Sequence, residues 1–369
     1  MEKISWLEPT EDLNATLVEP SDSVDFAAGI RVPGGETITL LVEMKESLRP
    51  SDVPRVADQM RRYTGQGDFS ERLYTRTGIR ASRDRIVLLV GAKWLSPRTQ
   101  EELRRFDLGW FDLAGNAHIE FPGVYLHVEG VANPFKEKTP GIPWKSEHAQ
   151  RVFRVLLDPG RRGHAWRQRE IEEACVPKVS LGTVNKVAKK LVNEAYAEES
   201  EEGLVVRDAS GLLKQWAQHY SPPYQRVRKF YTLLHGDALL DGLRDFCANR
   251  GNRFPSTETD FALAGLSAAK WQAPYVRDAT LYCYGTPMAA EQLKERLELE
   301  ESPEGANVIF WETAKPDPFL EAVEVSENLF ATNPVQTYLD LSAGGERSRE
   351  AAEFLFEHRL KQEWEGGDL

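Results

Sequence analysis

The feature that most constrains the fold of this chain is an apolar stretch, Leu40-Leu41-Val42-Glu43-Met44-Lys45, that holds a carboxylate and an amine two residues apart. Residues i and i+2 share one face of a β-strand, so Glu43 and Lys45 are expected to point the same way. A buried charge strongly destabilises a fold unless a partner compensates it. A solvated position at a sheet edge, a metal ion or an active site would each satisfy this requirement.

The segment before this stretch predicts a β-hairpin. Residues 23–32 alternate apolar and polar side chains, Pro33-Gly34-Gly35 interrupts them, and residues 36–44 continue as a second strand. This hairpin brings Asp25 towards the sheet that contains Glu43.

The segment after the stretch predicts a helix over residues 54–63, in which Gln59 and Tyr63 share one face because they lie four residues apart. The order along the chain is therefore Asp25, Glu43-x-Lys45 and Gln59-x-x-x-Tyr63. This order resembles the core of the PD-(D/E)XK nucleases in their RecB-like form.

The resemblance implies an N-terminal restriction-endonuclease-like mixed sheet in residues 1–135, with a metal-dependent endodeoxyribonuclease site. Asp25 and Glu43, helped by the carbonyl of Met44, would hold Mg²⁺ or Mn²⁺, and the ion would activate water beside the scissile phosphate. Lys45 would polarise that water, and Gln59 of the Gln59-x-x-x-Tyr63 element would orient it. Because fold does not imply function, a structural or DNA-holding domain is the alternative.

Composition limits the partners and the compartment. The chain has 369 residues, enough for two or three domains, and its net charge of −12 argues that any DNA contact comes from a local basic patch. Its three cysteines form no C-x-x-C pair, which excludes a cysteine zinc site and favours a reducing cytoplasm. No run approaches membrane-spanning length, so we expect a cytoplasmic protein without membrane contact.

A stretch rich in glycine and arginine covers residues 65–85. We interpret it as a solvated loop, and the alternative is a lip that meets phosphates beside the Glu43 site. The rest of the first domain is predicted as strands at 86–90, 110–112, 117–121 and 124–128, with a helix at 96–106 that Ser96 caps. Prolines in residues 130–143 then mark a linker.

Residues 145–207 have the pattern of a winged helix-turn-helix. Helices are predicted at 146–157, 167–174 and 181–192, with Ser180 as the cap of the third, and residues 196–206 would form the wing with Gly203 at its bend. Between Arg161 and Lys190, eight basic residues stand against three acidic ones, a local positive excess of the kind that DNA binding requires. The candidate DNA-binding residues are Arg167, Arg169, Ser180, Thr183, Lys186, Lys189 and Lys190. A protein-interaction module with solvated lysines is the alternative.

Residues 208–369 predict a C-terminal mixed α/β domain. Strands are expected at 229–234, 279–284 and 307–312, and helices at 238–248, 259–273, 288–297 and 347–361. The fold class is thus a multi-domain α/β (α+β) protein.

The winged helix and this C-terminal region together resemble the AbiEi-type antitoxins of type IV toxin–antitoxin (abortive infection) systems. The segments that carry the resemblance are Leu263-Ala264-Gly265-Leu266-Ser267-Ala268-Ala269, Ala273-Pro274-Tyr275-Val276-Arg277 and Asn333-Pro334-Val335-Gln336-Thr337-Tyr338-Leu339-Asp340-Leu341. It implies a DNA-binding antitoxin and autorepressor in phage defence, with double-stranded operator DNA as its partner. It also implies that the protein counteracts a nucleotidyltransferase-like toxin without forming a stable complex with it. The protein could itself form a homodimer. The alternative is a magnesium-dependent DNA endonuclease targeted by its winged helix.

Overall fold

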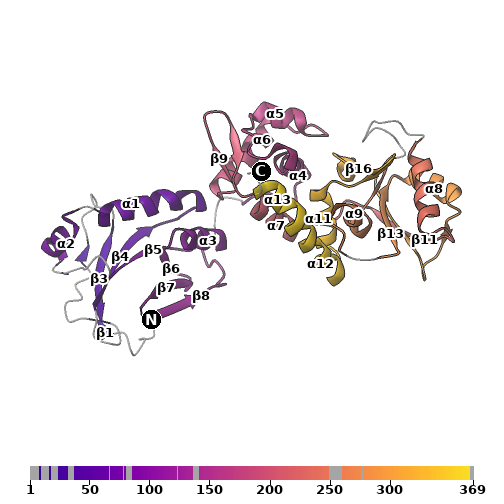
Figure 1. The fold of residues 1–369 in the computed structure, drawn as a ribbon. Helices are drawn as coiled ribbons and strands as arrows, with labels where there is room; N and C mark the ends of the chain where they lie inside the picture. The colour runs from indigo at the N-terminus through magenta and orange to yellow at the C-terminus, as the bar shows by residue number, and fades with distance from the viewer. Residues whose placement is uncertain are drawn as a thin grey trace. The chain divides into compact units, whose positions relative to one another are not determined.

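The computed structural model describes residues 8–9, 16–17, 24–31, 37–65, 67–77, 79, 85–122, 124–135, 141–248, 260–275 and 278–365 (Figure 1). The chain forms two compact units, residues 1–141 with 192–195, and residues 142–191 with 196–369. Both contain helices and mixed or antiparallel sheets, which confirms the predicted fold class. Within the described part of the chain, no helix is long and apolar enough to cross a bilayer.

The first unit is built on a sheet with the strand order β1-β3-β4-β5-β6-β7-β8, and β2 pairs with β3. β4 pairs with β3 in an antiparallel and with β5 in a parallel orientation, so the sheet is mixed, as predicted. The turn expected at residues 33–35 lies outside the described residues. The strands are β1 (Glu8–Pro9), β2 (Thr16–Leu17), β3 (Phe26–Arg31), β4 (Thr37–Lys45), β5 (Ile86–Ala92), β6 (Gly109–Asp112), β7 (Ala117–Phe121) and β8 (Val124–Val128).

The helices of this unit are α1 (Val53–Gly65), α2 (Phe69–Thr77) and α3 (Pro97–Arg105). Leu41 of β4 shares one buried cluster with Val56 and Met60 of α1, which places α1 on the face of β4 that also carries Glu43. Ser96 caps α3 by accepting a hydrogen bond from the Thr99 N–H, as predicted. The solvated loop that we predicted for residues 65–85 is wrong in part, because α2 forms there around the buried side chains of Phe69 and Leu73.

The second unit begins with the elements of a winged helix-turn-helix in the predicted order. These are α4 (Glu147–Leu156), α5 (Gln168–Ala174), α6 (Leu181–Asn193) and the hairpin of β9 (Ala197–Glu199) and β10 (Leu204–Val206). Trp166 joins the hairpin through backbone hydrogen bonds to Leu204 of 2.8 and 2.9 Å. Gly203, the last residue of the turn before β10, has φ +151°, and a Cβ there would lie 2.5 Å from the Trp166 carbonyl oxygen, so the turn requires glycine.

The remaining chain forms a sheet with the strand order β14-β11-β15-β13-β12-β17-β16. Its strands are β11 (Arg226–Tyr231), β12 (Phe261–Leu263), β13 (Leu281–Gly285), β14 (Glu300–Glu301), β15 (Val308–Glu312), β16 (Val323–Ser326) and β17 (Leu329–Ala331). The helices are α7 (Ala209–His219), α8 (Asp237–Ala248), α9 (Gly265–Gln272), α10 (Pro287–Arg296), α11 (Pro334–Ser342), α12 (Glu346–Leu355) and α13 (Lys361–Glu365), and a π-helix at Phe356–Leu360 joins the last two.

The predicted elements of this region are present except for one helix. The helix expected at 259–273 is wrong at its start, because Phe261–Leu263 form the interior strand β12, and α9 begins only at Gly265. All three residues of β12 are buried, and a short apolar segment of this kind does not distinguish a strand from a buried helix by its period.

Candidate functional site

Asp25 and Glu43 lie close together at the end of two paired strands of the first unit. The ladder between β3 and β4 ends with Phe26 opposite Val42, and Asp25, the residue before β3, donates its N–H to the Val42 carbonyl at 2.9 Å. Like charges this close to each other repel. The Asp25 carboxylate is fixed by a 2.7 Å hydrogen bond that its Oδ2 accepts from the Met44 N–H.

Glu43 is the buried centre of this group. It is 4% exposed, and its Oε1 accepts hydrogen bonds from Lys45 Nζ at 2.5 Å and from Gln59 Nε2 at 3.4 Å. Burial raises the pKa of Glu43, Asp25 raises it further, and Lys45 and Gln59 act in the opposite direction. The structure thus brings together four of the residues that the motif predicted.

Tyr63, the last residue of the motif, lies in the core. It is 4% exposed, its ring meets Phe69 edge to face at a centroid distance of 5.4 Å, and the Arg72 guanidinium lies 5.6 Å from its centroid. Burial raises the pKa of Tyr63, with Arg72 opposing. These contacts give Tyr63 a packing role, and a part in the chemistry stays a prediction.

The donor atoms of Asp25 and Glu43 fit a hard divalent cation. Asp25 Oδ1 and Glu43 Oε2 accept no hydrogen bond from any described residue, so each carboxylate has one oxygen available. A cation there would offset the repulsion between the two groups, and oxygen ligands are those that Mg²⁺ and Mn²⁺ prefer. Across the described ranges no cluster of three or more His, Cys, Asp or Glu side chains could hold a metal, so water and the Met44 carbonyl would complete this one.

The second candidate site is the exposed side of α6. Ser180 precedes the helix and accepts a 3.3 Å hydrogen bond from the Thr183 N–H, and the two hydroxyl groups lie 3.0 Å apart. Lys186 and Lys189 are exposed, whereas Lys190 is half-buried. A 3.2 Å hydrogen bond from Asn185 Nδ2 to Gln168 Oε1 holds α6 against α5.

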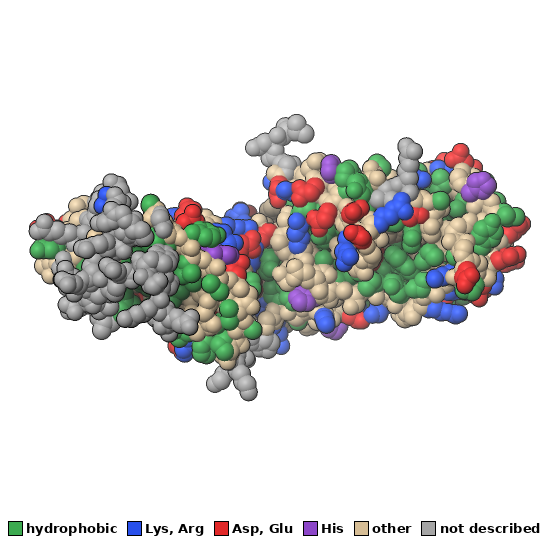
Figure 2. Space-filling model, turned by 90° about the horizontal axis from the view of Figure 1, so that it is seen from below, with side chains coloured by type: hydrophobic (Ala, Val, Ile, Leu, Met, Phe, Trp, Pro, Cys, Tyr) green, Lys and Arg blue, Asp and Glu red, His purple; other side chains and the backbone are tan. Residues whose placement is uncertain are grey.

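The exposed basic side chains of α5, α6 and the adjoining loops carry uncompensated charge. We call this set the α5–α6 basic residues. Within the described part of the chain, no member of the set makes an ion pair or a side-chain hydrogen bond. They are Arg167, Arg169, Lys178, Lys186 and Lys189. Elsewhere in the second unit charges of both signs are interspersed on the visible face, as Figure 2 shows.

A buried polar network joins α4 to the C-terminal sheet and helices. Arg154 Nη2 donates to Gln336 Oε1 at 2.5 Å, and Gln336 Nε2 donates to Tyr220 Oη at 2.6 Å and to Asp340 Oδ1 at 2.8 Å. Tyr220 and Tyr284 also donate to Asp340 Oδ1, at 2.9 and 2.8 Å. Burial raises the pKa of Asp340 to about 6, although these donors and Arg154 lower it. The sequence analysis missed this network, and the only signal for it was the segment around Gln336 and Asp340.

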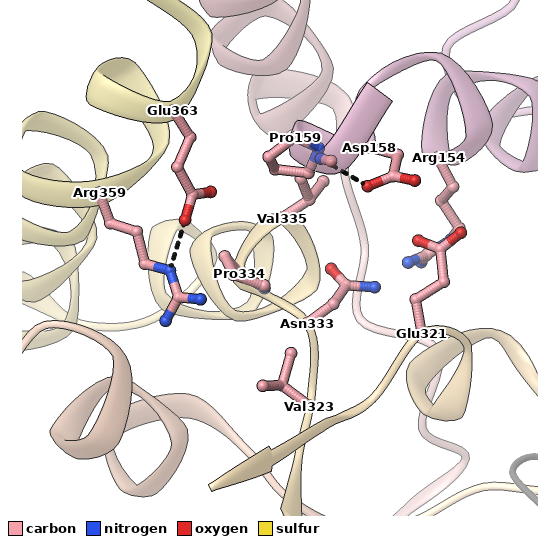
Figure 3. A pocket seen from close by; sticks show the side chains of 11 residues that line it. Arg154, Asp158, Pro159, Glu321, Val323, Asn333, Pro334, Val335, Arg359 and Glu363 are labelled. Carbon is pink, nitrogen blue, oxygen red and sulfur yellow. Dashed lines mark hydrogen bonds and ion pairs between the residues drawn. The ribbon is translucent and has the colours of Figure 1, made fainter. Parts of the chain in front are cut away.

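A cavity of 420 Å³ shares Arg154 with this network (Figure 3). An ion pair of 3.1 Å between Arg359 and Glu363 closes one side of it. The other lining residues are Asp158, Pro159, Gly160, Glu321, Val323, Asn333, Pro334 and Val335. Acidic and basic groups are mixed along its wall.

Residues 204–361 match a family model described as "Transcriptional regulator, AbiEi antitoxin, Type IV TA system". The match begins at the wing strand β10 and extends almost to the end of the described chain, which confirms the predicted resemblance over these residues. No curated protein and no solved structure matches the chain. The nuclease-like resemblance of the first unit stays a prediction.

Proposed function

We propose that this chain is a DNA-binding transcriptional regulator that represses its own operon and acts as the antitoxin of a type IV toxin–antitoxin system in phage defence. The observation that carries the proposal is the uncompensated charge of the α5–α6 basic residues. The family match over residues 204–361 supports it, because that family is described as transcriptional regulators with antitoxin function.

The arrangement of α6 suggests how DNA would be read. In a helix-turn-helix, residues near the N-terminus of the recognition helix contact base edges, and later basic residues contact phosphates. Ser180, Thr183 and Lys186 would accordingly read bases. The phosphate contacts would come from Lys189, Lys190, Arg167 and Arg169.

A transcriptional reporter tests the regulatory part. The DNA upstream of this protein's own gene drives the reporter, and the full chain is supplied as wild type or as the double variant Lys186→Glu/Lys189→Glu. Wild type should repress and the variant should not, because reversed charges repel phosphates. Lys229→Glu, an exposed lysine on β11, is the matched control and should repress like wild type. Equal repression by all three proteins would refute the role of α6.

The antitoxin part has its own test. Expression of a neighbouring nucleotidyltransferase-like toxin should arrest growth, and co-expression of this protein should relieve the arrest without the two proteins co-purifying. A stable complex would contradict a type IV mechanism, and persistent arrest beside soluble, folded protein would contradict antitoxin function.

The first unit supports a second candidate function, metal-dependent DNA cleavage. The specific observation is the convergence of Asp25, Glu43, Lys45 and Gln59, with one oxygen on each carboxylate that accepts no hydrogen bond from the described residues. Mg²⁺ or Mn²⁺ bound there would activate water, and Lys45 would stabilise charge on the phosphate.

Plasmid cleavage in the presence of Mg²⁺ or Mn²⁺ tests this second function. Glu43→Ala and Lys45→Ala should abolish cleavage, whereas Glu46→Ala, which alters an exposed carboxylate paired with Lys93 at 2.7 Å, should not. Equal cleavage by wild type and Lys45→Ala would identify the activity as a contaminant. No cleavage of any DNA would leave the unit with a structural or DNA-holding role.

A further inference from the structure

Two histidines form a pair on the last hairpin of the first unit. His118 of β7 lies directly opposite His127 of β8 in the strand register, so both side chains project from the same face. Their Nδ1 atoms are 3.2 Å apart, and the two rings meet at 89° with their centroids 5.3 Å apart.

This separation suits two ligands of one metal ion. Zinc binds imidazole nitrogen at about 2.0–2.1 Å, and two nitrogens at a tetrahedral angle around it are then about 3.3 Å apart. A hydrogen bond between the rings would fit the same distance only when one Nδ1 carries a proton and the other does not. A metal ion would instead engage the lone pair of both.

The ring of His127 has a carboxylate nearby, just beyond hydrogen-bond distance. Its other ring nitrogen, Nε2, lies 3.6 Å from Glu129 Oε2, and Arg104 pairs with the second oxygen of the same carboxylate. Ligating histidines commonly direct the second ring nitrogen to a carboxylate, which orients the ring and makes it a better donor.

The pair is also accessible. β8 is the terminal strand in the order of its sheet, the side chain of His127 is 32% exposed, and His118 is half-buried. Water can therefore occupy the coordination positions that the two imidazoles leave open.

We propose that His118 and His127 bind a divalent transition-metal ion of the zinc class through their Nδ1 atoms, with water as the remaining ligands. Imidazole favours Zn²⁺, Ni²⁺ and Cu²⁺ over Mg²⁺, so this site differs in metal class from the carboxylate site at Asp25 and Glu43. The bound ion links the two strands of the edge hairpin. This site is independent of the proposed DNA binding.

The test is a titration of tag-free, full-length protein with Zn²⁺ in the presence of excess Mg²⁺. Calorimetry measures the binding, and NMR spectra record the imidazole signals during the titration. Wild type should bind one equivalent of Zn²⁺, and His118→Ala and His127→Ala should each lose this binding. Among the histidine signals, those of His118 and His127 should shift at the lowest Zn²⁺ concentrations. Glu129→Gln should weaken binding roughly tenfold through the orientation of His127.

His148→Ala, a change in the second unit, is the matched control and should leave the affinity unchanged. Unaltered Zn²⁺ binding in the double variant His118→Ala/His127→Ala would overturn the proposal. Wild-type spectra in which neither His118 nor His127 responds to Zn²⁺ would also overturn it. This second result is independent of whether the variants fold.

Discussion

Arg154 and Gln336 lie 182 positions apart in the chain, yet a 2.5 Å hydrogen bond joins their buried side chains. Arg154 is on α4, the first helix of the winged motif, and Gln336 is on α11 within the family-matched segment. The winged motif and the C-terminal region therefore share buried polar contacts within one compact unit. Changes in this network are expected to affect both parts together.

Replacing Gln336 with leucine should destabilise the second unit by about 3 kcal/mol, because a buried guanidinium loses a hydrogen-bond partner. The loss of stability should be large, since Arg154 Nε and Nη1 already have no hydrogen-bond partner in the described structure. Chemical denaturation of the full chain measures the change. Gln218→Leu, at an exposed position of α7, is the control, and an equal effect of both variants would contradict the importance of the network.

Asp340 should make stability depend on pH. Its pKa is about 6 in the folded protein against an ordinary value of 3.8, so the folded state binds more protons than the unfolded state between these values. The free energy of unfolding should therefore fall as the pH rises from about 4 to about 7, by about 3 kcal/mol from this group. Asp340→Asn keeps the oxygen that accepts from Gln336, Tyr220 and Tyr284 and should remove this part of the slope. Identical pH profiles for wild type and variant would contradict the assignment.

How well the sequence predicts structure differs between local and long-range features. The β4 strand, the Ser96 cap and the wing with its glycine follow from patterns a few residues long, and each is present as predicted. The hydrogen bonds of the network around Asp340 join residues up to 182 positions apart, and no local pattern relates Arg154 to Gln336. Local patterns therefore predicted these elements, although they failed at α2 and β12, and they could not predict the network.

The wing turn offers a direct test of a backbone constraint. Gly203→Ala should destabilise the second unit by about 1–3 kcal/mol, because the residue has φ +151° and the added methyl group would meet the Trp166 carbonyl. Gly182→Ala is the matched control, since its Cβ would have only Ser180 Oγ, 4.0 Å away, within contact range. That change should stabilise α6 by up to about 1 kcal/mol. Thermal unfolding compares the two, and equal effects would contradict the constraint.

At the candidate site of the first unit, some features were predictable from local sequence patterns and others were not. Glu43, Lys45 and Gln59 were placed together correctly from strand and helix periods. Their partner Tyr63 shares the helical face of Gln59, but α2 was not expected, and Phe69 of that helix packs against its ring. The glycines and arginines around α2 favoured a loop, and tertiary burial of Phe69 and Leu73 outweighs that local preference.

Metal binding at the carboxylate pair should be visible as a change in stability. Mn²⁺ at a hundredfold excess over its Kd should stabilise the wild-type first unit by about 2–3 kcal/mol. Glu43→Gln should remove this response, and without metal it should not lower the unfolding midpoint, because it removes a buried charge near Asp25. Glu46→Gln, 83% exposed at its side chain, is the control and should respond like wild type. A wild-type protein that Mn²⁺ does not stabilise would contradict the site.

The central claim, that α6 enters DNA, is tested most directly by affinities for an operator duplex and a random duplex across a salt series. Lys189→Ala should weaken binding to both duplexes alike and reduce the salt slope by about one unit, because it removes one phosphate contact. Lys186→Ala should weaken operator binding by about 1–3 kcal/mol and random-duplex binding by less, because it removes a base contact. Unchanged affinity and slope in both variants would contradict the claim and favour a protein-interaction role for the winged motif.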